Sequence, residues 1–356
     1  MRDRKSRREA GRLRRSFVRD KGVEHNAAVT EDNWEELLDE HGHSRRRRML
    51  VSEVIAHLDT VDDDDESAAI VISVMSARCR VFDRGEERDC IVPPHIAMRR
   101  KSALAVGDRV RIVDDRIETV LPRHSVLARP DPLHKHLQRL IAANIDVVVS
   151  VVSVKAPPLR PRLIDRVLIA IQRGGAQPVI CVNKIDLLDG PLHELDRYRD
   201  LGIDVILCST KTGDGLDALR VAVEGKMAAL VGHSGVGKSS ILNALDERLQ
   251  LATRSLHRRG TGRHTTTRST LYDFGGGTYL IDTPGIREFG LWDLDRESLR
   301  DYFPEFVEPS ESCRFTDCTH VHEPDCEVKR RVESAALDRA RYDTYVRLYE
   351  DLEERR

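Results

Sequence analysis

The sequence predicts a multidomain protein built around an α/β domain with a parallel sheet. A small β-barrel of the OB type precedes this domain, and a zinc-binding helical domain follows it. Three observations carry the prediction. Short β-branched runs separated by turns fill residues 49–125, long apolar runs alternate with helical stretches from Ile145 onward, and three cysteines cluster with histidines near the carboxyl end. A chain of 356 residues is long enough for two to three domains.

The amino-terminal residues 1–48 are predicted to form a charged, disordered extension. Residues 1–21 carry ten Lys and Arg against three acids, whereas residues 22–44 carry seven acids and no Lys or Arg. The overall formal charge of -2 hides this segregation. Blocks of like charge with few apolar residues stay disordered or bind polyanions. Contact with RNA and a merely solvated tail therefore both remain open for this extension.

Residues 49–125 are predicted to form the barrel, an OB-fold RNA-binding domain of about five short strands. The runs expected to be strands are 49–55, 69–75, 78–82, 89–92, 109–113 and 117–121. The acidic run 62–66 is expected to be a hairpin loop in solvent. Barrels of this type often bind nucleic acid, and a barrel with only a structural role is the alternative.

Residues 126–293 are predicted to form the α/β domain. The apolar runs expected to be buried strands are 145–154, 178–182, 204–208, 226–231 and 278–281, with helices at 162–173 and 215–223. This alternation implies a parallel sheet whose ligand loops follow the carboxyl ends of the strands. The motifs described next follow such strands or lie close after them.

The segment that follows Val231 has the sequence of a phosphate-binding loop. It lies between an apolar strand and a helical stretch, which is the context such a loop requires. Its glycines let backbone N–H groups turn toward the phosphates, Lys238 reaches the outer phosphates, and Ser239 is expected to bind Mg²⁺. The residues expected to bind the nucleotide here are Gly232, His233, Ser234, Gly235, Val236, Gly237, Lys238, Ser239 and Ser240.

Two further motifs are expected to hold the guanine base. They comprise Asn183, Lys184 and Asp186 after one strand, and Ser209, Thr210 and Lys211 after the next. The Asp186 carboxylate can accept hydrogen bonds from N1–H and from the exocyclic amine of guanine, whereas adenine offers no such pair of donors. The site should therefore select GTP over ATP.

A fourth motif, Asp282-Thr283-Pro284-Gly285, ends another strand. Asp282 is expected near the magnesium ion, directly or through water, and the Gly285 N–H near the γ-phosphate. Many GTPases place a water-orienting glutamine just after this glycine, but residues 286–289 contain none. Hydrolysis therefore needs another residue or a partner.

His264 is the candidate catalytic residue, expected to position the attacking water. It lies in the segment 262–267, directly before three threonines. The alternative for His264 is a basic residue that faces solvent. One of Thr265, Thr266 and Thr267 is expected to complete the magnesium shell in the GTP state, and we prefer Thr266.

The order of the motifs is rotated relative to standard GTPases. The base-recognition motifs come first, the phosphate loop follows, and the segments 262–267 and 282–285 come last. This order predicts a circularly permuted P-loop GTPase domain, cut between its third and fourth strands. The permutation places a new domain, residues 294–356, directly after the nucleotide-sensing segment.

That carboxyl-terminal domain is predicted to bind zinc. Cys313, Cys318, His320 and Cys326 offer three thiolates and one imidazole within fourteen residues. Four soft ligands so close together suit tetrahedral Zn²⁺ and leave no open position, so the ion should be structural. An iron–sulfur cluster is the alternative, as is His322 in place of His320. The stretch 327–354 is predicted to be one helix.

The composition also bears on location. No run approaches the ~18 apolar residues that a membrane span needs, and the amino terminus lacks the apolar core of a secretory signal. The other four cysteines are scattered, as is usual in a reducing compartment. We therefore expect a cytoplasmic protein without a membrane partner. We also expect it to be monomeric.

The permuted order, the segment 262–267 and the spacing of the zinc ligands together resemble the ribosome small-subunit-dependent GTPase A family. The resemblance covers about residues 49–350 and includes motifs at 106–108, 123–129 and 141–146. It implies that the three domains bind the small ribosomal subunit and its rRNA late in assembly, and that the subunit stimulates hydrolysis of GTP to GDP. The family pattern favours His320 over His322 as the zinc ligand.

The chain departs from the family pattern in its long charged extension, its acidic loop at 62–66, and Arg109, which stands where an aromatic residue is common. These departures bear on RNA contact and leave the nucleotide motifs intact. The leading interpretation is a GTP hydrolase that acts in maturation of the small subunit. The alternative is a GTP-controlled rRNA-binding module in which turnover is incidental.

Overall fold

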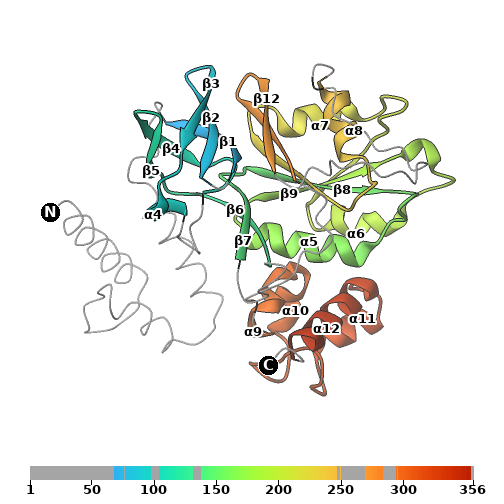
Figure 1. Ribbon diagram of the computed structural model, residues 1–356. Coiled ribbons are helices and arrows are strands. Elements are labelled where there is room, and N and C mark those ends of the chain that lie inside the picture. The colour runs from blue at the N-terminus through green and yellow to red at the C-terminus, as the bar shows by residue number, and fades with distance from the viewer. Residues whose placement is uncertain are drawn as a thin grey trace, which may run out of the picture. The chain divides into compact units, whose positions relative to one another are not determined.

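Figure 1 shows the computed structural model of the protein. The structure describes residues 68–75, 77–97, 104–130, 138–246, 249, 269–283, 294 and 296–353. The predicted extension 1–48, the expected strand 49–55 and the acidic loop 62–66 lie outside the described residues. None of the described helices is long and apolar enough to cross a membrane.

The first described region is a closed barrel of five strands (Figure 1). Its strands are β1 (Ala69–Val74), β2 (Arg78–Asp83), β3 (Glu86–Ile91), β4 (Arg109–Val113) and β5 (Arg116–Val120), and the short helix α4 (Pro94–Ala97) follows β3. The order around the barrel is β1-β2-β3-β5-β4. Alternate residues point inward and fill it, as a strand's two-residue period requires. The fully buried members of this core are Val71, Cys79, Val81, Cys90, Val110 and Ile117.

The second region is built on a six-stranded sheet. Its strands are β8 (Val147–Ser153), β9 (Gln177–Asn183), β10 (Asp204–Leu207), β11 (Met227–Val231), β12 (Thr270–Gly275) and β13 (Thr278–Asp282). Their order is β10-β9-β8-β11-β13-β12, and every neighbouring pair is parallel except β13 with β12. The first strand in sequence, β8, and the last, β13, flank β11, which confirms the predicted permutation.

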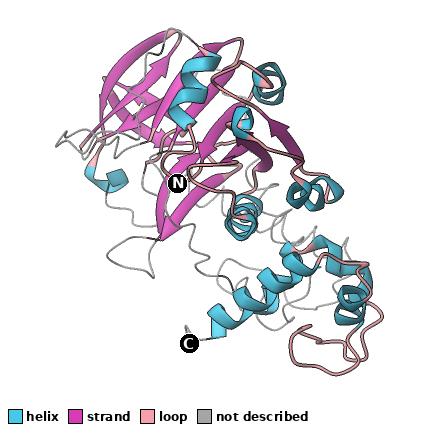
Figure 2. Ribbon diagram, turned by 90° about the vertical axis from the view of Figure 1, so that its right-hand side faces the viewer, coloured by secondary structure: helices cyan, strands magenta, loops and turns pink. Residues whose placement is uncertain are grey.

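Helices cover both faces of this sheet (Figures 1 and 2). Helices α5 (Pro161–Arg173) and α6 (Asp196–Asp200) lie on one face, and α7 (Leu216–Val223) and α8 (Lys238–Leu245) lie on the other. Strand β8 is a near-continuous run of valines that are at most 1% exposed from Val147 to Val151. Such a run is typical of a strand buried on both faces. The helices predicted at 162–173 and 215–223 are confirmed within one residue.

Two elements differ from the sequence-based expectation. An antiparallel pair, β6 (Val126–Pro130) and β7 (Gln138–Ala143), lies between the barrel strands and β8 and was not predicted. The single helix predicted over 327–354 is wrong, because the structure has α11 (Glu327–Glu333) and α12 (Arg339–Glu353) instead. Ala335 adopts a left-handed φ of 60°, which ends α11. The Asp338 carboxylate accepts a hydrogen bond from the Arg341 N–H at 2.8 Å, so it caps the start of α12.

The barrel is fastened to the α/β region by the motifs at 106–108, 123–129 and 141–146. Asp108 is fully buried and accepts hydrogen bonds from Arg123 Nε at 2.6 Å and Nη2 at 2.7 Å. Gly107 has a φ of 87°, and a Cβ there would lie 2.2 Å from the Ala143 carbonyl oxygen. Asn144 Nδ2 donates to the Gly107 carbonyl oxygen at 3.0 Å. Only glycine fits between these backbones, so the junction has one geometry.

Asp108→Ala is expected to destabilise the protein by about 3 kcal/mol or more, because it leaves the guanidinium of Arg123, only 15% exposed, without its carboxylate. The free energy of unfolding in urea measures the effect. The matched control is Asp217→Ala, which removes a carboxylate that is 94% exposed from its pair with Arg220. That exposed pair should contribute less than about 1 kcal/mol. Equal costs for the two variants would show that the junction does not depend on the buried pair.

The carboxyl-terminal region is helical with an aromatic core. Its elements are α9 (Arg296–Leu299), η4 (Arg300–Tyr302), η5 (Pro304–Phe306), α10 (Val307–Ser310), α11 and α12. Phe303 stacks on Phe306 at 5.3 Å between ring centroids, and Tyr345 meets both rings edge-on. The tyrosines of α12 are therefore core residues, because Tyr342, Tyr345 and Tyr349 are at most 8% exposed.

This region packs against α5 of the α/β region. Arg341 is buried and donates to Asp165 Oδ1 at 2.8 Å and to Glu305 Oε1 at 2.8 Å. Asp165 also accepts from the Tyr198 hydroxyl at 2.9 Å. Ile169 of α5 belongs to the same apolar cluster as the aromatic residues of the carboxyl-terminal region. Helix α5 therefore contributes to the packing of both regions.

Candidate GTP-binding site and metal centre

The predicted phosphate loop joins β11 to the first turn of α8. Gly232 has a φ of 151°, and a Cβ there would lie 2.3 Å from the Val151 carbonyl oxygen. Gly237 has a φ of 104°, and its Cβ would lie 2.2 Å from Asn183 Nδ2. Each glycine thus lets the loop pass a neighbouring strand end that a side chain would push away. The loop is shaped by its sheet neighbours as well as by its own sequence.

Lys238 lies inside this loop. The residue is 8% exposed, and its Nζ donates to the carbonyl oxygens of Gly232 at 2.7 Å and His233 at 3.3 Å. Burial lowers the pKa of Lys238, and the nearby Asp282 carboxylate opposes this shift. Burial in turn raises the pKa of Asp282, which Lys238 opposes. The two groups therefore share one partly desolvated space, in which a phosphate and a divalent cation would balance their charges.

Asn183 joins three of the predicted motifs. Its Nδ2 donates to the Val236 carbonyl oxygen at 2.9 Å, in the phosphate loop. Its Oδ1 accepts from the N–H groups of Lys184 at 2.8 Å and Thr210 at 3.3 Å. A buried amide with these partners holds the base loops and the phosphate loop at a fixed separation. The sequence predicted Asn183 only as a nucleotide contact.

Lys184 also bridges the two halves of the site. It has a left-handed φ of 67°, and its Nζ donates to the carbonyl oxygens of Gly235 at 2.7 Å and Ala156 at 2.5 Å. The side chain therefore lies along the phosphate loop. Its charge is held by these backbone oxygens.

Asp186 and Ser209 were predicted to form the base end of the site, and the structure brings them into contact. Asp186 Oδ1 accepts from the Ser209 hydroxyl at 2.7 Å, and Oδ2 lies 3.7 Å from Lys211 Nζ. Ser209 Oγ accepts in turn from the N–H groups of Lys211 at 3.2 Å and Thr212 at 3.3 Å. The carboxylate is thereby held in one orientation, with an exposed fraction of 12%.

The remaining nucleotide motifs are only partly described. Thr283 Oγ1 donates to the Leu230 carbonyl oxygen at 2.6 Å, which fixes the end of β13 beside β11. Ser239 and Ser240 lie in the first turn of α8, and both are half-buried. His264, Thr266 and Gly285 lie outside the described residues. Their assigned roles therefore stay predictions.

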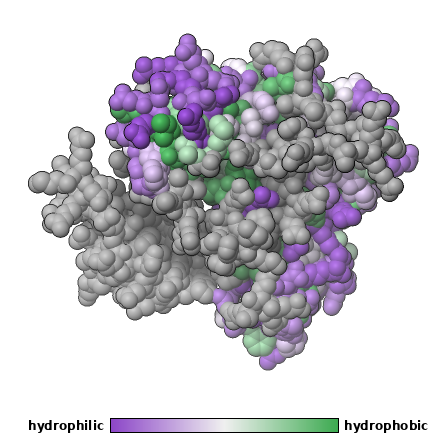
Figure 3. Space-filling view, viewed as in Figure 1, coloured by the Kyte–Doolittle hydropathy of each residue, from purple (hydrophilic) through white to green (hydrophobic). Residues whose placement is uncertain are grey.

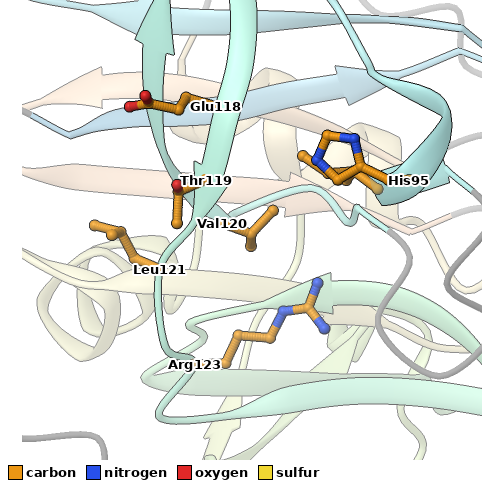
Figure 4. A pocket seen from close by; sticks show the side chains of 7 residues that line it. His95, Glu118, Thr119, Val120, Leu121 and Arg123 are labelled. Carbon is orange, nitrogen blue, oxygen red and sulfur yellow. The ribbon is translucent and has the colours of Figure 1, made fainter. Parts of the chain in front are cut away.

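Two hollows bear on where a ligand could lie. One of about 100 Å³ lies beside the phosphate loop, where Gly232, His233 and Val236 meet the end of β8 and the start of α5. The other, of about 370 Å³, lies on the barrel and is lined by residues that include His95, Glu118 and Arg123 (Figure 4). No residue of the nucleotide motifs lines the barrel hollow, so the nucleotide assignment rests on the loops at the sheet edge.

The four predicted metal ligands come together in the carboxyl-terminal region. The ligand atoms of Cys313, Cys318, His320 and Cys326 all lie within 4.8 Å of one another. His320 Nδ1 lies 3.4 Å from the sulfur of Cys326 and 3.7 Å from that of Cys313. The exposed His322 instead packs its ring near Tyr349, at 6.4 Å between centroids. The cluster therefore has three thiols and one imidazole, which is one of the ligand sets that structural zinc sites use.

A second set of contacts orients His320 toward the sulfurs. The Ser310 hydroxyl donates to the Phe306 carbonyl oxygen at 2.5 Å, so it can only accept from His320 Nε2, 3.0 Å away. The proton is thereby placed on Nε2, and the Nδ1 lone pair faces the cysteines. Burial lowers the pKa of His320 to about 4, so the imidazole is neutral at neutral pH. Burial raises the pKa of Cys318 to about 12, so a bound cation is needed to keep this sulfur as thiolate.

Comparison with known proteins agrees with this geometry. The family described as RsgA GTPase matches residues 120–292. A Chlorobaculum parvum protein named small ribosomal subunit biogenesis GTPase RsgA is 40% identical over 280 residues, which cover 74% of this chain and 90% of that protein. The protein of the same name from Pectobacterium atrosepticum is 38% identical over 327 residues, covering 87% of this chain and 91% of that one.

Two solved structures share the fold. The crystal structure of YjeQ from Thermotoga maritima aligns with a TM-score of 0.65 and 34% identity, covering 82% of this chain and 99% of that one. The structure of YloQ, described as a circularly permuted GTPase, aligns with a TM-score of 0.62 and 27% identity, covering 83% and 98%. On the identity and coverage of these relatives, together with the permuted sheet and the Cys₃His cluster, the chain belongs to the RsgA family of GTPases.

Proposed function

We propose that this GTPase binds the small ribosomal subunit through its rRNA, acts late in the maturation of that subunit, and is stimulated by it to hydrolyse GTP. The observation that supports this most is the combination of a permuted GTPase sheet with a barrel and a Cys₃His domain, each in direct contact with the sheet region. A GTP site tied on two sides to other domains suits a protein that reports the state of a large partner. The relatives named for small-subunit biogenesis share this chain over most of their length.

We assign the nucleotide contacts as follows. Asp186 recognises guanine, and the loops of Lys184 and Ser209 form the walls around the base. The phosphates lie in the loop around Lys238. The full set that we propose to bind GTP is Asn183, Lys184, Asp186, Ser209, Thr210, Lys211, Gly232, His233, Ser234, Gly235, Val236, Gly237, Lys238, Ser239, Ser240, Asp282 and Gly285.

Two metal ions belong to this proposal. Mg²⁺ would arrive with GTP and be held by Ser239 and Thr266, with Asp282 close by, and it would neutralise charge on the β- and γ-phosphates. Zn²⁺ would be held by the four-residue cluster at Cys313–Cys326 and would be structural. The orientation of His320 by Ser310 and the size of the cluster support zinc, because both match a closed tetrahedral site.

The proposed chemistry is attack of a water molecule on the γ-phosphorus in line with the leaving GDP. Since residues 286–289 contain no glutamine, we assign His264 to orient that water. We further propose that the protein works as a cytoplasmic monomer. A GTP-controlled rRNA-binding module with incidental turnover is the second candidate. The absence of a water-orienting glutamine from residues 286–289 favours it, because slow intrinsic turnover is then expected.

Cosedimentation with purified ribosomal subunits tests the proposed partner. In the presence of a non-hydrolysable GTP analogue the protein should pellet with small subunits and much less with large subunits. GDP should release it, because binding depends on the γ-phosphate in this proposal. Equal pelleting with both subunits, or none with the small one, would contradict the assignment.

His264→Ala separates catalysis from binding. The variant should keep its affinity for GTP and lose subunit-stimulated hydrolysis by about 10²-fold or more, because the residue is assigned to the water and not to the bound nucleotide. His193→Ala, at an exposed histidine of the same domain, is the control. Normal stimulated turnover in His264→Ala would assign the catalytic group to the ribosome or to another side chain.

Asp186→Asn should lower the affinity for GDP by about 10- to 100-fold, because an amide cannot accept from both guanine donors. Discrimination against ADP should fall by the same factor. Asp189→Asn makes the same charge change at a side chain that is 84% exposed, and it should leave both affinities unchanged. Calorimetric titration measures them, and unaltered discrimination in Asp186→Asn would remove this residue from the base site.

A further inference from the structure

Exposed apolar and basic side chains alternate across four neighbouring strands of the barrel. Arg78 of β2 pairs with Ile91 of β3, Ile91 pairs with Arg116 of β5, and Arg116 pairs with Val113 of β4. All four residues are exposed. Directly paired residues on neighbouring strands point to the same face of a sheet, so these side chains form one row on the outside of the barrel. We call this set the cross-strand row.

The apolar members of the row are unusually exposed. Ile91 is 42% exposed and Val113 is 52% exposed. Met75, 39% exposed, adjoins the row because its N–H donates to the Arg78 carbonyl oxygen at 2.7 Å. The described residues expose six large apolar side chains in total, and these three lie at one end of one small barrel. Apolar patches interrupt the hydrophilic surface over the barrel strands in the space-filling view (Figure 3). Such clustering marks a contact surface.

The two arginines of the row differ from their neighbours. Arg80 pairs with Asp89 at 2.9 Å, and Arg88 pairs with Asp83 at 2.7 Å. By contrast, no carboxylate of the described residues lies within ion-pair distance of Arg78 or Arg116. Their guanidinium groups can bind a phosphate without first breaking an ion pair.

The position of the row identifies its ligand. It runs from the β1–β2 turn, across β3, to the β4–β5 turn at Asp114 and Asp115. OB barrels bind oligonucleotides on the face of strands 2 and 3 and on these two loops. The two arginines stand two strands apart, about 10 Å, so they can hold two separate points of one backbone. Ile91 lies between them, and unpaired bases can pack on it and on the neighbouring Met75 and Val113.

We propose that the cross-strand row, with Met75, binds single-stranded RNA through its backbone phosphates. This inference rests on the proposed function, since it names the surface of the barrel that meets rRNA. The contact should show little sequence preference, because the row contains guanidinium and aliphatic groups and no side chain that reads base edges in a fixed geometry.

The test compares Arg78→Gln/Arg116→Gln with Arg80→Gln in the full-length protein. The control removes an arginine from the same face, but one whose charge is already balanced by Asp89. The probe is a labelled single-stranded RNA of about 15 nucleotides, titrated over a series of salt concentrations. The double variant should bind about 10-fold more weakly or worse. Its plot of log affinity against log salt should be shallower by about 1.4, or about 0.7 for each phosphate that the protein no longer neutralises. Arg80→Gln should change both quantities much less.

Ile91→Ala should weaken binding a few-fold with an unchanged salt slope, because it removes apolar contact and no charge. Unchanged affinity and slope in the double variant would overturn the proposal. A second result would also overturn it: the double variant binds the RNA probe normally but no longer cosediments with small subunits. The row would then contact a ribosomal protein. Failure of the wild-type protein to cosediment with small subunits, while the row still governs probe binding, would instead overturn the proposed function and leave this surface standing.

Discussion

Lys238→Ala is expected to lower GTP turnover by at least about 10²-fold, which is the usual cost of removing one preorganised charged donor from a site of charge transfer. The ammonium group lies inside the phosphate loop, and Lys238 as a whole is only 8% exposed. A phosphate in the loop would replace the Gly232 and His233 carbonyl oxygens as its partner. Alanine leaves that phosphate without its nearest positive charge, so affinity for GTP should fall as well.

Lys226→Ala is the matched control for this variant. Lys226 directly precedes the strand β11 that leads into the phosphate loop, and its Nζ donates to the Ala222 carbonyl oxygen at 3.0 Å. The control variant removes the same charge at the opposite end of the same strand, far from the strand's carboxyl end. Steady-state release of phosphate measures turnover, and thermal unfolding checks that both variants are folded. Turnover near the wild-type rate in Lys238→Ala would refute the phosphate site.

Cys318→Ser is expected to reduce bound zinc to well below one ion per chain. Metal binding and local folding are one equilibrium in such a cluster, since the thiolates are held together only by the ion. Residues 313–353 should lose helical signal, and association with small subunits should fall. GTP binding should persist, because the sheet of the α/β region has apolar clusters of its own on both faces.

Helix α5 makes the α/β region partly dependent on the carboxyl-terminal region. Asp165 and Ile169 of α5 contact the carboxyl-terminal region. Unfolding of that region should therefore lower the free energy of unfolding of the α/β region by an amount that urea titration can detect. Cys90→Ser, at a buried barrel cysteine outside the cluster, is the control for exchanging sulfur for a hydroxyl group. Zinc content is measured by elemental analysis. Full zinc occupancy in Cys318→Ser would contradict the ligand assignment. Complete loss of GTP binding would show that the cluster is part of the GTPase core.

The sequence was most informative where one side chain or one short motif has a single structural use. The valine run of β8, the phosphate loop between β11 and α8, and the ligand set around His320 all lie where the sequence predicted them. Each combines a strong local pattern with a chemical requirement, so little depends on the rest of the fold.

Other features depend on partners that are distant in sequence. Asn183 meets the Val236 carbonyl oxygen 53 residues away, and Arg341 meets Asp165 176 residues away. Neither contact can be read from a local pattern. The cap of α12 is different, because Asp338 preceding a helical stretch was a readable signal. Apolar residues recur at helical spacing on both sides of residue 335, and this pattern concealed the break between α11 and α12.

The cross-strand row shows a related limit. Arg78, Ile91 and Arg116 are scattered in the sequence, and only the barrel register places them side by side. A search for clusters of basic residues finds the amino-terminal extension instead. Register is a tertiary property, because it is set by turn geometry and by which face of each strand is buried.

We propose above all that the small ribosomal subunit activates GTP hydrolysis at this permuted site. It is tested most directly by single-turnover hydrolysis of GTP by the wild-type protein, with and without an excess of purified small subunits. The claim predicts a hydrolysis rate that rises by at least about 10-fold with small subunits, equivalent to about 1.4 kcal/mol off the barrier, and by much less with large subunits. A rate that is the same with and without small subunits, under conditions where the protein is bound to them, would contradict it.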